Sequence, residues 1–366
     1  MQSENNKGLG EDEKETYKSP NENLIQKISN SVNSNKEIFI VNDFKNSSKE
    51  NEFLFFLKPE FFYIKDYNYI EPLLNLILKK IQQFNIEING IATVKGNFLK
   101  KSKIIENHYG FINKMSMKAS KIVGKNEKMK IKEILGIENI QKFKILGGHE
   151  VLEYYKSLNE DDLSRLWYSG HSVRISEGFY VQVQKINGDD VIIINGFNPS
   201  QIKHYTSQDS VIVLFLLDTD TSWEIIRNDF AGDTFPENAK KGSIRETLYR
   251  NKEKYNIKSI NVAHNFIHAS SGPFDAVFEI CNFVGNIKDI SYCKYNTNVY
   301  NLMTCRFNLD VADYENCLKN PKVEINNLQT DLFSLTKNKN TLEAIDIYIK
   351  YFKNLKNSYK KENKSA

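Results

Sequence analysis

Cysteine is scarce in this chain, and the few cysteines lack the spacing of a metal site. Only four occur among 366 residues, at positions 281, 293, 305 and 317. No pair forms a C-x-x-C motif and no histidine lies at ligand spacing from them, which excludes the common zinc patterns. Buried thiols in a reducing compartment are the favoured interpretation, with disulfides as the lesser alternative.

Long apolar runs are also missing. No stretch approaches the ~18 residues needed to span a bilayer. The polar, acidic start at residues 1–6 has neither the basic nor the apolar region of a signal peptide. We therefore expect a soluble, cytoplasmic protein with no membrane partner.

A strong excess of one charge is absent as well. Fifty Lys and Arg against 46 Asp and Glu give a net charge of +4, which is too mild to indicate nucleic-acid binding. The 19 tyrosines and 23 phenylalanines lie within hydrophobic runs, so we interpret them as core rather than as base-stacking platforms. We expect no nucleic-acid partner.

Composition divides the chain into three parts. Residues 1–48 are rich in Asn, Ser, Lys and Glu and are predicted to be a largely disordered extension, with a helix and a strand within 22–41. Residues 49–284 form the domain that carries the motifs described below. Residues 285–366 form a second extension, which ends in a basic amphipathic helix and a lysine-rich tail.

The middle part begins with alternating strands and helices. Phe53–Leu57 is a continuous apolar run bounded by charge, typical of a strand buried on both faces. An apolar stripe predicts a helix over 71–81 with Pro72 at its first position. A second strand over 84–94 and a helix over 102–109 follow. This order indicates an α/β sandwich with helices packed on a sheet.

A less regular insertion at about 113–208 interrupts this order. Within it, residues 178–194 alternate as a β-hairpin with Asn187-Gly188 at the turn. The main pattern resumes with a buried strand at 211–217 and a strand-like stretch at 257–267.

His268 and Glu279 are the first candidates for chemistry. The glutamate follows the histidine by eleven residues, where a carboxylate on a short helix can fold back onto the imidazole. A carboxylate that accepts from one ring nitrogen fixes the tautomer and leaves the other nitrogen free as a nucleophile. Taken alone, an ordinary polar histidine before a helix is the more common interpretation.

The irregular stretch from Arg227 to Arg245 is a second candidate. A loop of this length inside a compact domain usually has a function. Arginine forks and a short hydroxyl donor such as Thr234 suit a polyphosphate, although an ordinary surface loop explains the composition equally well. Lys58 follows the first buried strand, where α/β folds often bind phosphate, although a solvated lysine is the simpler interpretation.

Together these motifs resemble the nucleoside diphosphate kinase family. Four motifs occur in the family's order: Lys58-Pro59-Glu60; His108-Tyr109; Gly232-Asp233-Thr234-Phe235-Pro236 with Gly242-Ser243-Ile244-Arg245; and Asn265-Phe266-Ile267-His268-Ala269-Ser270 with Glu279. Two of the four keep the family's internal spacing. The resemblance covers about 50–112 and 209–284.

The resemblance implies a ferredoxin-like α/β (α+β) sandwich, in which helices pack on a four-stranded antiparallel sheet. It also implies nucleoside diphosphate kinase activity, with ping-pong transfer of a γ-phosphate from a nucleoside triphosphate to a diphosphate through a phosphohistidine at His268. Glu279 would hold the other ring nitrogen and Ser270 would orient Glu279. The implied nucleotide-binding residues are Lys58, Tyr109, Arg227, Thr234, Arg245 and Asn265. Mg²⁺ is the implied cofactor, held mainly by nucleotide phosphates rather than by protein ligands.

Departures from the family pattern leave a second function open. Glu60 stands where the family has Asp, His264 where it has Arg, and Ala269 where it usually has Gly; about a hundred extra residues follow Tyr109. These changes motivate the alternative of a catalytically altered domain that acts as a nucleotide-binding or protein-interaction module, and the retained His268, Glu279, Thr234 and Arg245 argue against it. The family forms hexamers or tetramers, so a homo-oligomer is an expectation, although an insertion of this size could block those contacts.

Overall fold

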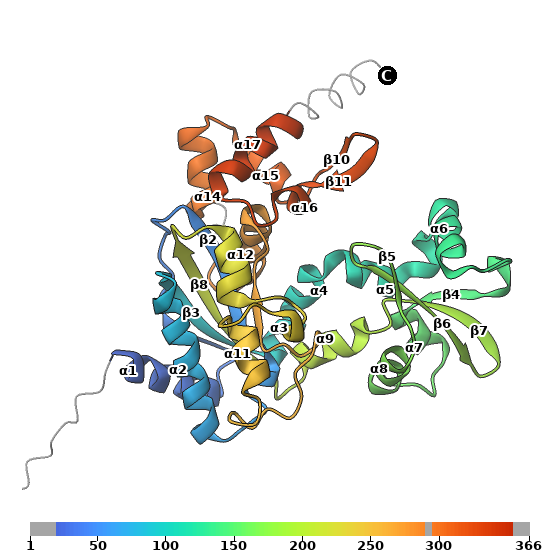
Figure 1. The fold of residues 1–366 in the computed structure, drawn as a ribbon, viewed down its shortest axis with the longest axis horizontal. Coiled ribbons are helices and arrows are strands. Elements are labelled where there is room, and N and C mark those ends of the chain that lie inside the picture. Colours follow the sequence, from blue (N-terminus) through green and yellow to red (C-terminus); the bar gives the residue numbers. More distant parts are fainter. Residues whose placement is uncertain (1–19, 290–294, 354–366) are drawn as a thin grey trace, which may run out of the picture.

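The computed structural model describes residues 20–289 and 295–353. Figure 1 shows a central sheet with its helices, an inserted module that projects to the right, and a small C-terminal module at the top. The predicted disorder of the first residues and the predicted basic tail fall on 1–19 and 354–366, outside the described residues. Within the described part, no helix is both long and apolar enough to cross a membrane.

The central sheet is antiparallel, with five strands in the order β1-β3-β8-β2-β9. These strands are β1 Ile38–Asn42, β2 Asn51–Leu57, β3 Glu87–Lys95, β8 Val211–Thr219 and β9 Ile267–Ala269. Both β2 and β8 are buried along their whole length. This confirms the two strands predicted from continuous apolar runs.

Helices cover both faces of this sheet because successive side chains of a strand point to opposite sides. Phe53, Phe55 and Leu57 enter one apolar core, whereas Leu54 and Phe56 enter the other. The first core is closed by α1 Pro20–Asn33, α2 Tyr67–Gln83 and α11 Ile244–Arg250. The second is closed by α3 Gly96–Ser102, α4 Ile104–His108, α9 Asn198–Thr206 and α12 Pro273–Ile287.

Residues 20–42 form helix α1 and strand β1, in agreement with the helix and strand expected within 22–41, and both pack with the central sheet. Helix α1 buries Ile25 and Ile28 in the first core, and β1 pairs with β3 at the sheet edge. The Ser31 and Thr93 hydroxyls are 2.5 Å apart across this junction. The sheet therefore has five strands where four were expected, and the N-terminal segment supplies the additional one.

Two further elements differ from the sequence prediction. Helix α2 begins at Tyr67, with the Asp66 carboxylate accepting the Asn68 N–H at 2.9 Å, so Pro72 lies inside the helix rather than at its first position. The strand expected over 257–267 is reduced to β9, and the residues before it are irregular.

The inserted module has a sheet of its own. Its strands are β4 Lys144–Gly147, β5 Val173–Ser176, β6 Phe179–Ile186 and β7 Asp189–Ile194, in the order β4-β7-β6-β5. The predicted hairpin is β6–β7, with Asn187 and Gly188 at φ values of 49° and 89°, the left-handed conformation that an Asn-Gly turn favours. The module's helices are α5 Gly110–Ile122, α6 Lys125–Leu135, α7 Gly148–Tyr154 and α8 Glu160–Ser169.

The C-terminal module packs on the outer side of α12. Phe274 and Val277 of that helix share an apolar cluster with Tyr314, Ile345 and Tyr348. The module's elements are α14 Asn298–Asn301, α15 Val311–Cys317, β10 Lys322–Ile325, β11 Leu328–Asp331, α16 Leu332–Thr336 and α17 Thr341–Tyr351. Helix α12 is therefore fixed from both sides, by the sheet and by this module.

Short helical turns complete the described chain. They are Pro59–Phe61, Ile140–Lys142, Trp223–Ile225 (α10), Ile226–Ala231, Pro236–Asn238 and Leu302–Arg306.

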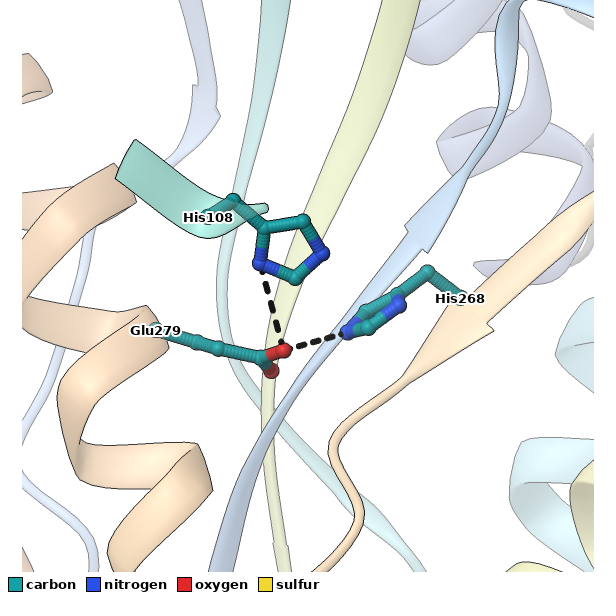
Figure 2. Close-up of side chains that lie close together, drawn as sticks. All are labelled: His108, His268 and Glu279. Atoms are coloured by element: carbon teal, nitrogen blue, oxygen red, sulfur yellow. Dashed lines mark hydrogen bonds and ion pairs between the residues drawn. The ribbon is translucent and has the colours of Figure 1, made fainter. Parts of the chain in front are cut away.

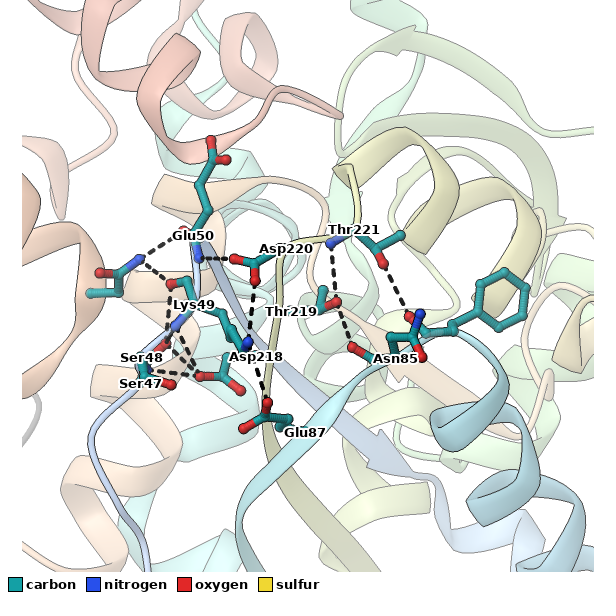
Figure 3. Close-up of polar contacts among 12 residues, drawn as sticks. Ser47, Ser48, Lys49, Glu50, Asn85, Glu87, Asp218, Thr219, Asp220 and Thr221 are labelled. Carbon is teal, nitrogen blue, oxygen red and sulfur yellow. Dashed lines mark hydrogen bonds and ion pairs between the residues drawn. The ribbon is translucent and has the colours of Figure 1, made fainter.

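A polar network holds the end of the sheet where β2 begins and β8 ends (Figure 3). One oxygen of Asp218 accepts from the Ser47 hydroxyl at 2.8 Å and from the Ser48 N–H at 3.0 Å. The other oxygen is buried and has no hydrogen-bond partner. Glu52 pairs with Asp218 across the two strands and is also buried. This end of the sheet therefore contains two buried carboxyl groups side by side.

Candidate functional site

The candidate site is built on the short edge strand β9 and the start of α12. In β9, His268 lies opposite Phe56 of β2, and the two rings stack with centroids 4.5 Å apart. Helix α12 begins at Pro273, whose fixed φ suits a first helical position. Within the first two turns of this helix the chain brings Glu279 back alongside His268, as Figure 2 shows.

A chain of hydrogen bonds fixes the imidazole of His268. Its Nε2 lies 2.8 Å from Glu279 Oε1, and the Ser270 hydroxyl donates to Glu279 Oε2 at 2.5 Å. The same hydroxyl accepts the Leu54 N–H at 3.0 Å, which ties Ser270 to the central strand β2. The structure thus brings together the three residues predicted as the catalytic set, and it leaves His268 Nδ1 as the ring nitrogen that Glu279 does not hold.

Burial shifts the ionisation of this pair. It lowers the pKa of His268 to about 3; Asp275 opposes the shift, and nearby cations reinforce it. The imidazole is therefore neutral at neutral pH, as a nucleophilic nitrogen must be. Burial also raises the pKa of Glu279, while His108 and the hydrogen bond from Ser270 oppose that rise.

Sequence reasoning missed His108 as a member of this cluster. Its Nδ1 lies 3.4 Å from Glu279 Oε1, and its side chain is only 8% exposed. Its ring centroid is 4.8 Å from that of His268, with the two rings nearly perpendicular. The sequence feature that points to His108 is the His108-Tyr109 motif, in which only Tyr109 is predicted to be a site residue.

Tyr109 lies beside the cluster rather than within it. Its ring contacts His108 at 4.6 Å and Tyr205 at 6.3 Å between centroids. Burial raises the pKa of Tyr109 to about 12, so the phenol is protonated. The ring of His108 therefore stands between His268 and Tyr109, the residue that was predicted to bind nucleotide.

Lys58, Asn265 and Thr234 are brought together, but not all by their side chains. Lys58 Nζ donates to Asn265 Oδ1 at 2.7 Å, and Asn265 Nδ2 donates to the backbone oxygen of Thr234 at 3.0 Å. The Thr234 side chain itself is exposed. The amide of Asn265 therefore links the strand-end lysine to the loop predicted to bind phosphate.

Arg227 and Arg245 lie on either side of the histidine. Arg227 Nη1 donates to the backbone oxygen of Ala269 at 2.9 Å. Arg245 donates to the backbone oxygens of Gly232 at 2.6 Å and Ile267 at 3.0 Å. One residue more separates Arg227 from Gly232 than the family pattern has, yet Arg227 still reaches the strand that carries His268.

Two of the cations at this site are buried, and Arg227 is partly buried. Lys58 is 8% exposed and Arg245 is 4% exposed. Within the described residues, no ion pair joins Lys58, Arg227 or Arg245 to a carboxylate. Burial lowers the pKa of Lys58 to about 8 and that of Arg245 to about 9. Buried positive charges that make no direct ion pair are costly, so the site favours an anionic ligand.

Glu60 orders the loop that leads into β9. Its Oε1 accepts the Phe266 N–H at 2.9 Å, and its Oε2 lies 2.8 Å from His204 Nε2. Burial opposes ionisation of this carboxyl, but the hydrogen bond from His204 and the charge of Lys58 lower its pKa to about 2. Phe266 has a φ of +69°, which is strained for a residue with a bulky side chain. Glu60 therefore stabilises a bend that the loop does not adopt easily.

The insertion contributes to the site through His204. This residue lies in α9, and its ring stacks on His264 with centroids 4.8 Å apart. His264 is the residue that replaces the family's arginine. No local pattern could have identified His204, because Glu60 precedes it by 144 residues.

Two surface cavities of about 340 and 350 Å³ lie elsewhere. One is in the inserted module, lined in part by Ser120, Lys128 and Phe143, and the other is beside Asn228 and Asp233. Neither contains His268 or Glu279, so the site is defined by its side chains rather than by these cavities.

Comparisons with known proteins find a distant structural similarity only. No family model matches the chain, and no curated protein matches it. A solved nucleoside diphosphate kinase from Encephalitozoon cuniculi is 12% identical, with 64% of this chain and 88% of that chain covered and a TM-score of 0.31. An NDP kinase from Pyrobaculum aerophilum is 19% identical, with 63% and 94% covered and a TM-score of 0.31. Both similarities are weak, so the function below is proposed on the geometry of the site.

Proposed function

We propose that the chain is a phosphotransferase of the nucleoside diphosphate kinase type, in which His268 carries the phosphoryl group between nucleotides. The observation that carries the proposal is the hydrogen-bond chain from Ser270 through Glu279 to His268 Nε2. It holds a neutral imidazole in one tautomer and presents Nδ1 as the nucleophile.

The proposed reaction has two symmetric halves. The lone pair of His268 Nδ1 attacks the γ-phosphorus of a nucleoside triphosphate, an N–P bond forms, and the bond to the β–γ bridging oxygen breaks. The departing nucleoside diphosphate keeps that electron pair. The Nε2 proton stays between His268 and Glu279, so the carboxylate balances the positive charge that develops on the ring. A second nucleoside diphosphate then takes the phosphoryl group by the reverse path.

The buried cations support phosphate binding at the nucleophile. Phosphoryl transfer depends mainly on positioning and on stabilising the charge of the transferring group. Arg227 and Arg245 are held by the carbonyl oxygens next to His268, and Lys58 is held by Asn265. These three side chains would bind the phosphates, and Thr234 is exposed, so its hydroxyl could take the same role.

The side chains are compatible with Mg²⁺ that arrives on the nucleotide. Among the described residues, the one group of three or more potential metal ligands from His, Cys, Asp and Glu side chains is His108, His268 and Glu279, which lacks the oxygen-rich shell that Mg²⁺ requires. The protein thus offers cations for the phosphates and no carboxylate cage for the ion. When bound, Mg²⁺ would neutralise charge on the β- and γ-phosphate oxygens.

The strand order supports the fold that this proposal needs. Without β1, the sheet reads β3-β8-β2-β9, which is second, third, first and fourth along the chain, with every pair antiparallel. A ferredoxin-like sandwich has this order, and here it places β9, with His268, beside β2.

The second candidate is a nucleotide-binding module without turnover. It is favoured by the hydrogen bonds that Arg227 and Arg245 already make to backbone oxygens, since those donors must be shared or released before they contact phosphate. Such a module would bind a triphosphate and leave His268 unmodified.

Incubation with γ-labelled ATP and Mg²⁺ separates the two candidates. We expect acid-labile, alkali-stable label on the wild-type protein, removed by addition of a nucleoside diphosphate. His268→Ala should abolish the label, whereas His171→Ala, which changes an exposed histidine of the inserted module, should retain it. Binding of ATP without labelling of the protein would favour the nucleotide-binding module without turnover. Label that persists in His268→Ala would exclude His268 as the nucleophile.

A further inference from the structure

The cluster around Glu279 has one feature that phosphoryl transfer does not use. His108 Nδ1, His268 Nε2 and Glu279 Oε1 lie within 4.8 Å of one another. They come from three separate elements, α4, β9 and α12, and Figure 2 shows both rings directed at the same carboxylate oxygen. Two imidazole nitrogens and one carboxylate oxygen are a common set of zinc ligands.

His108 supplies an independent indication of a ligand. Its Nδ1 is buried and makes no hydrogen bond, and its distance of 3.4 Å from Glu279 Oε1 is long for one. Buried polar atoms almost always have a partner. A ring nitrogen left unpaired and directed at a carboxylate that already has two other partners indicates that something else is bound there.

The surroundings of Glu279 are those of a metal-binding carboxylate. Ser270 donates to Oε2 at 2.5 Å, which fixes the carboxylate plane and leaves Oε1 facing the two rings. Outer hydrogen bonds of this kind orient metal ligands and add to their affinity. His268 is 18% exposed, so an ion can reach the cluster from solvent.

We propose that His108, His268 and Glu279 form a binding site for a divalent transition-metal ion of the Zn²⁺ class. Bonds of about 2.0–2.2 Å in a tetrahedral arrangement place ligand atoms roughly 3.3 Å apart. The 2.8 Å and 3.4 Å separations to Glu279 Oε1 are already near this spacing. Three protein ligands leave a fourth position for water, and the nitrogen-rich set selects against Mg²⁺.

This site and the proposed phosphoryl acceptor share the imidazole ring of His268, through Nε2 and Nδ1 respectively, which makes the ion an inhibitor if the proposed function holds. A metal ion on His268 Nε2 takes the place of the proton that Glu279 otherwise holds there. The imidazole then cannot become the charge-balanced intermediate of the proposed reaction. Zn²⁺ should therefore block labelling from γ-labelled ATP, and a chelator should restore it.

Metal binding is tested directly, without nucleotide. Chelator-treated full-length protein is titrated with Zn²⁺ by calorimetry and with Cu²⁺ followed by electron paramagnetic resonance. We expect one tight site whose Cu²⁺ spectrum shows two nitrogen ligands. His108→Phe, which keeps an aromatic ring against Phe56 and Phe283, should weaken Zn²⁺ binding at least tenfold. The control His171→Gln should bind as the wild type does.

The outcomes distinguish this site from the proposed function. Equal Zn²⁺ affinity in the wild type and His108→Phe, or a wild-type Cu²⁺ spectrum with a single nitrogen ligand, would overturn the site. The spectrum of the wild type needs no variant to fold, so it decides the matter even if His108→Phe is unstable. Labelling with Mg²⁺ and chelator-stripped buffers reports on the phosphoryl acceptor alone, so either proposal can fail while the other stands.

Discussion

Arg227 and Arg245 donate hydrogen bonds to the backbone oxygens of the two residues that flank His268. Arg227 bonds to Ala269 and Arg245 bonds to Ile267. β9 is the last strand of its sheet, and exposed edge strands carry unpaired backbone groups. The two guanidinium groups satisfy that edge and, by the same bonds, hold positive charge next to the nucleophile proposed here. The same two arginines therefore stabilise the sheet edge and supply positive charge to the site.

Replacing Arg245 should weaken triphosphate binding. Arg245→Ala removes a buried cation and its two backbone contacts, and hydrogen bonds to a charged group contribute about 1.5–3 kcal/mol. We expect a loss of roughly ten- to a hundredfold in ATP affinity, measured by calorimetry on the full chain. Arg250→Ala is the matched control, since Arg250 lies on the same helix, α11, and is exposed. Unchanged ATP affinity in Arg245→Ala would mean that the loop is not the phosphate site.

Local patterns in the sequence were sufficient for the parts of the fold that are determined locally. Continuous apolar runs identified β2 and β8, and the Asn187-Gly188 turn identified the β6–β7 hairpin. The eleven-residue spacing from His268 to Glu279 identified a pair that the structure places in contact. In each case the pattern that gives the prediction lies within a short window of the sequence.

The parts that were missed depend on distant residues. β1 joins the sheet only because β3 offers it a partner, and His204 reaches Glu60 across 144 residues. The bend at Phe266 could not be predicted from the sequence either. A positive φ goes against the local preference of phenylalanine, and the bend is supported by the hydrogen bond from Phe266 N–H to the distant Glu60. Such contacts follow from the packing of the whole chain, and no sequence window contains both partners.

Glu52 should make the stability of the protein fall as pH rises. Burial raises the pKa of Glu52 from 4.5 to about 8, with a hydrogen bond from Asn298 opposing and the neighbouring Asp218 reinforcing the shift. A carboxyl group whose pKa is raised in the folded state contributes stability that is complete below its unfolded pKa and is lost as pH rises through the folded value. We therefore expect the free energy of unfolding to contain a component that declines between about pH 4.5 and pH 8.

Glu52→Gln tests this assignment. The amide cannot ionise, so the variant should lose that component and gain stability relative to the wild type as pH approaches 8. Denaturant unfolding at several pH values measures the difference. Glu237→Gln, at an exposed position in the short helical turn Pro236–Asn238, should follow the wild-type curve. Parallel pH profiles for Glu52→Gln and the wild type would show that Glu52 is ionised in the folded protein throughout.

His204 should couple the inserted module to the site. His204→Ala leaves Glu60 with the Phe266 N–H and without its imidazole partner, in a buried setting where losing a hydrogen bond to a charged group costs about 1.5–3 kcal/mol. The bend at Phe266 should become less ordered. Asn265 should then lose its fixed position, and its hydrogen bond from Lys58 should weaken. We expect a lower melting temperature together with weaker ATP binding and slower labelling of His268. His149→Ala is the control, because His149 lies in the same insertion and its ring bonds to Ser116 within the inserted module. If both variants lose stability equally while ATP binding and labelling stay intact, the insertion is a separate unit and His204 does not act on the site.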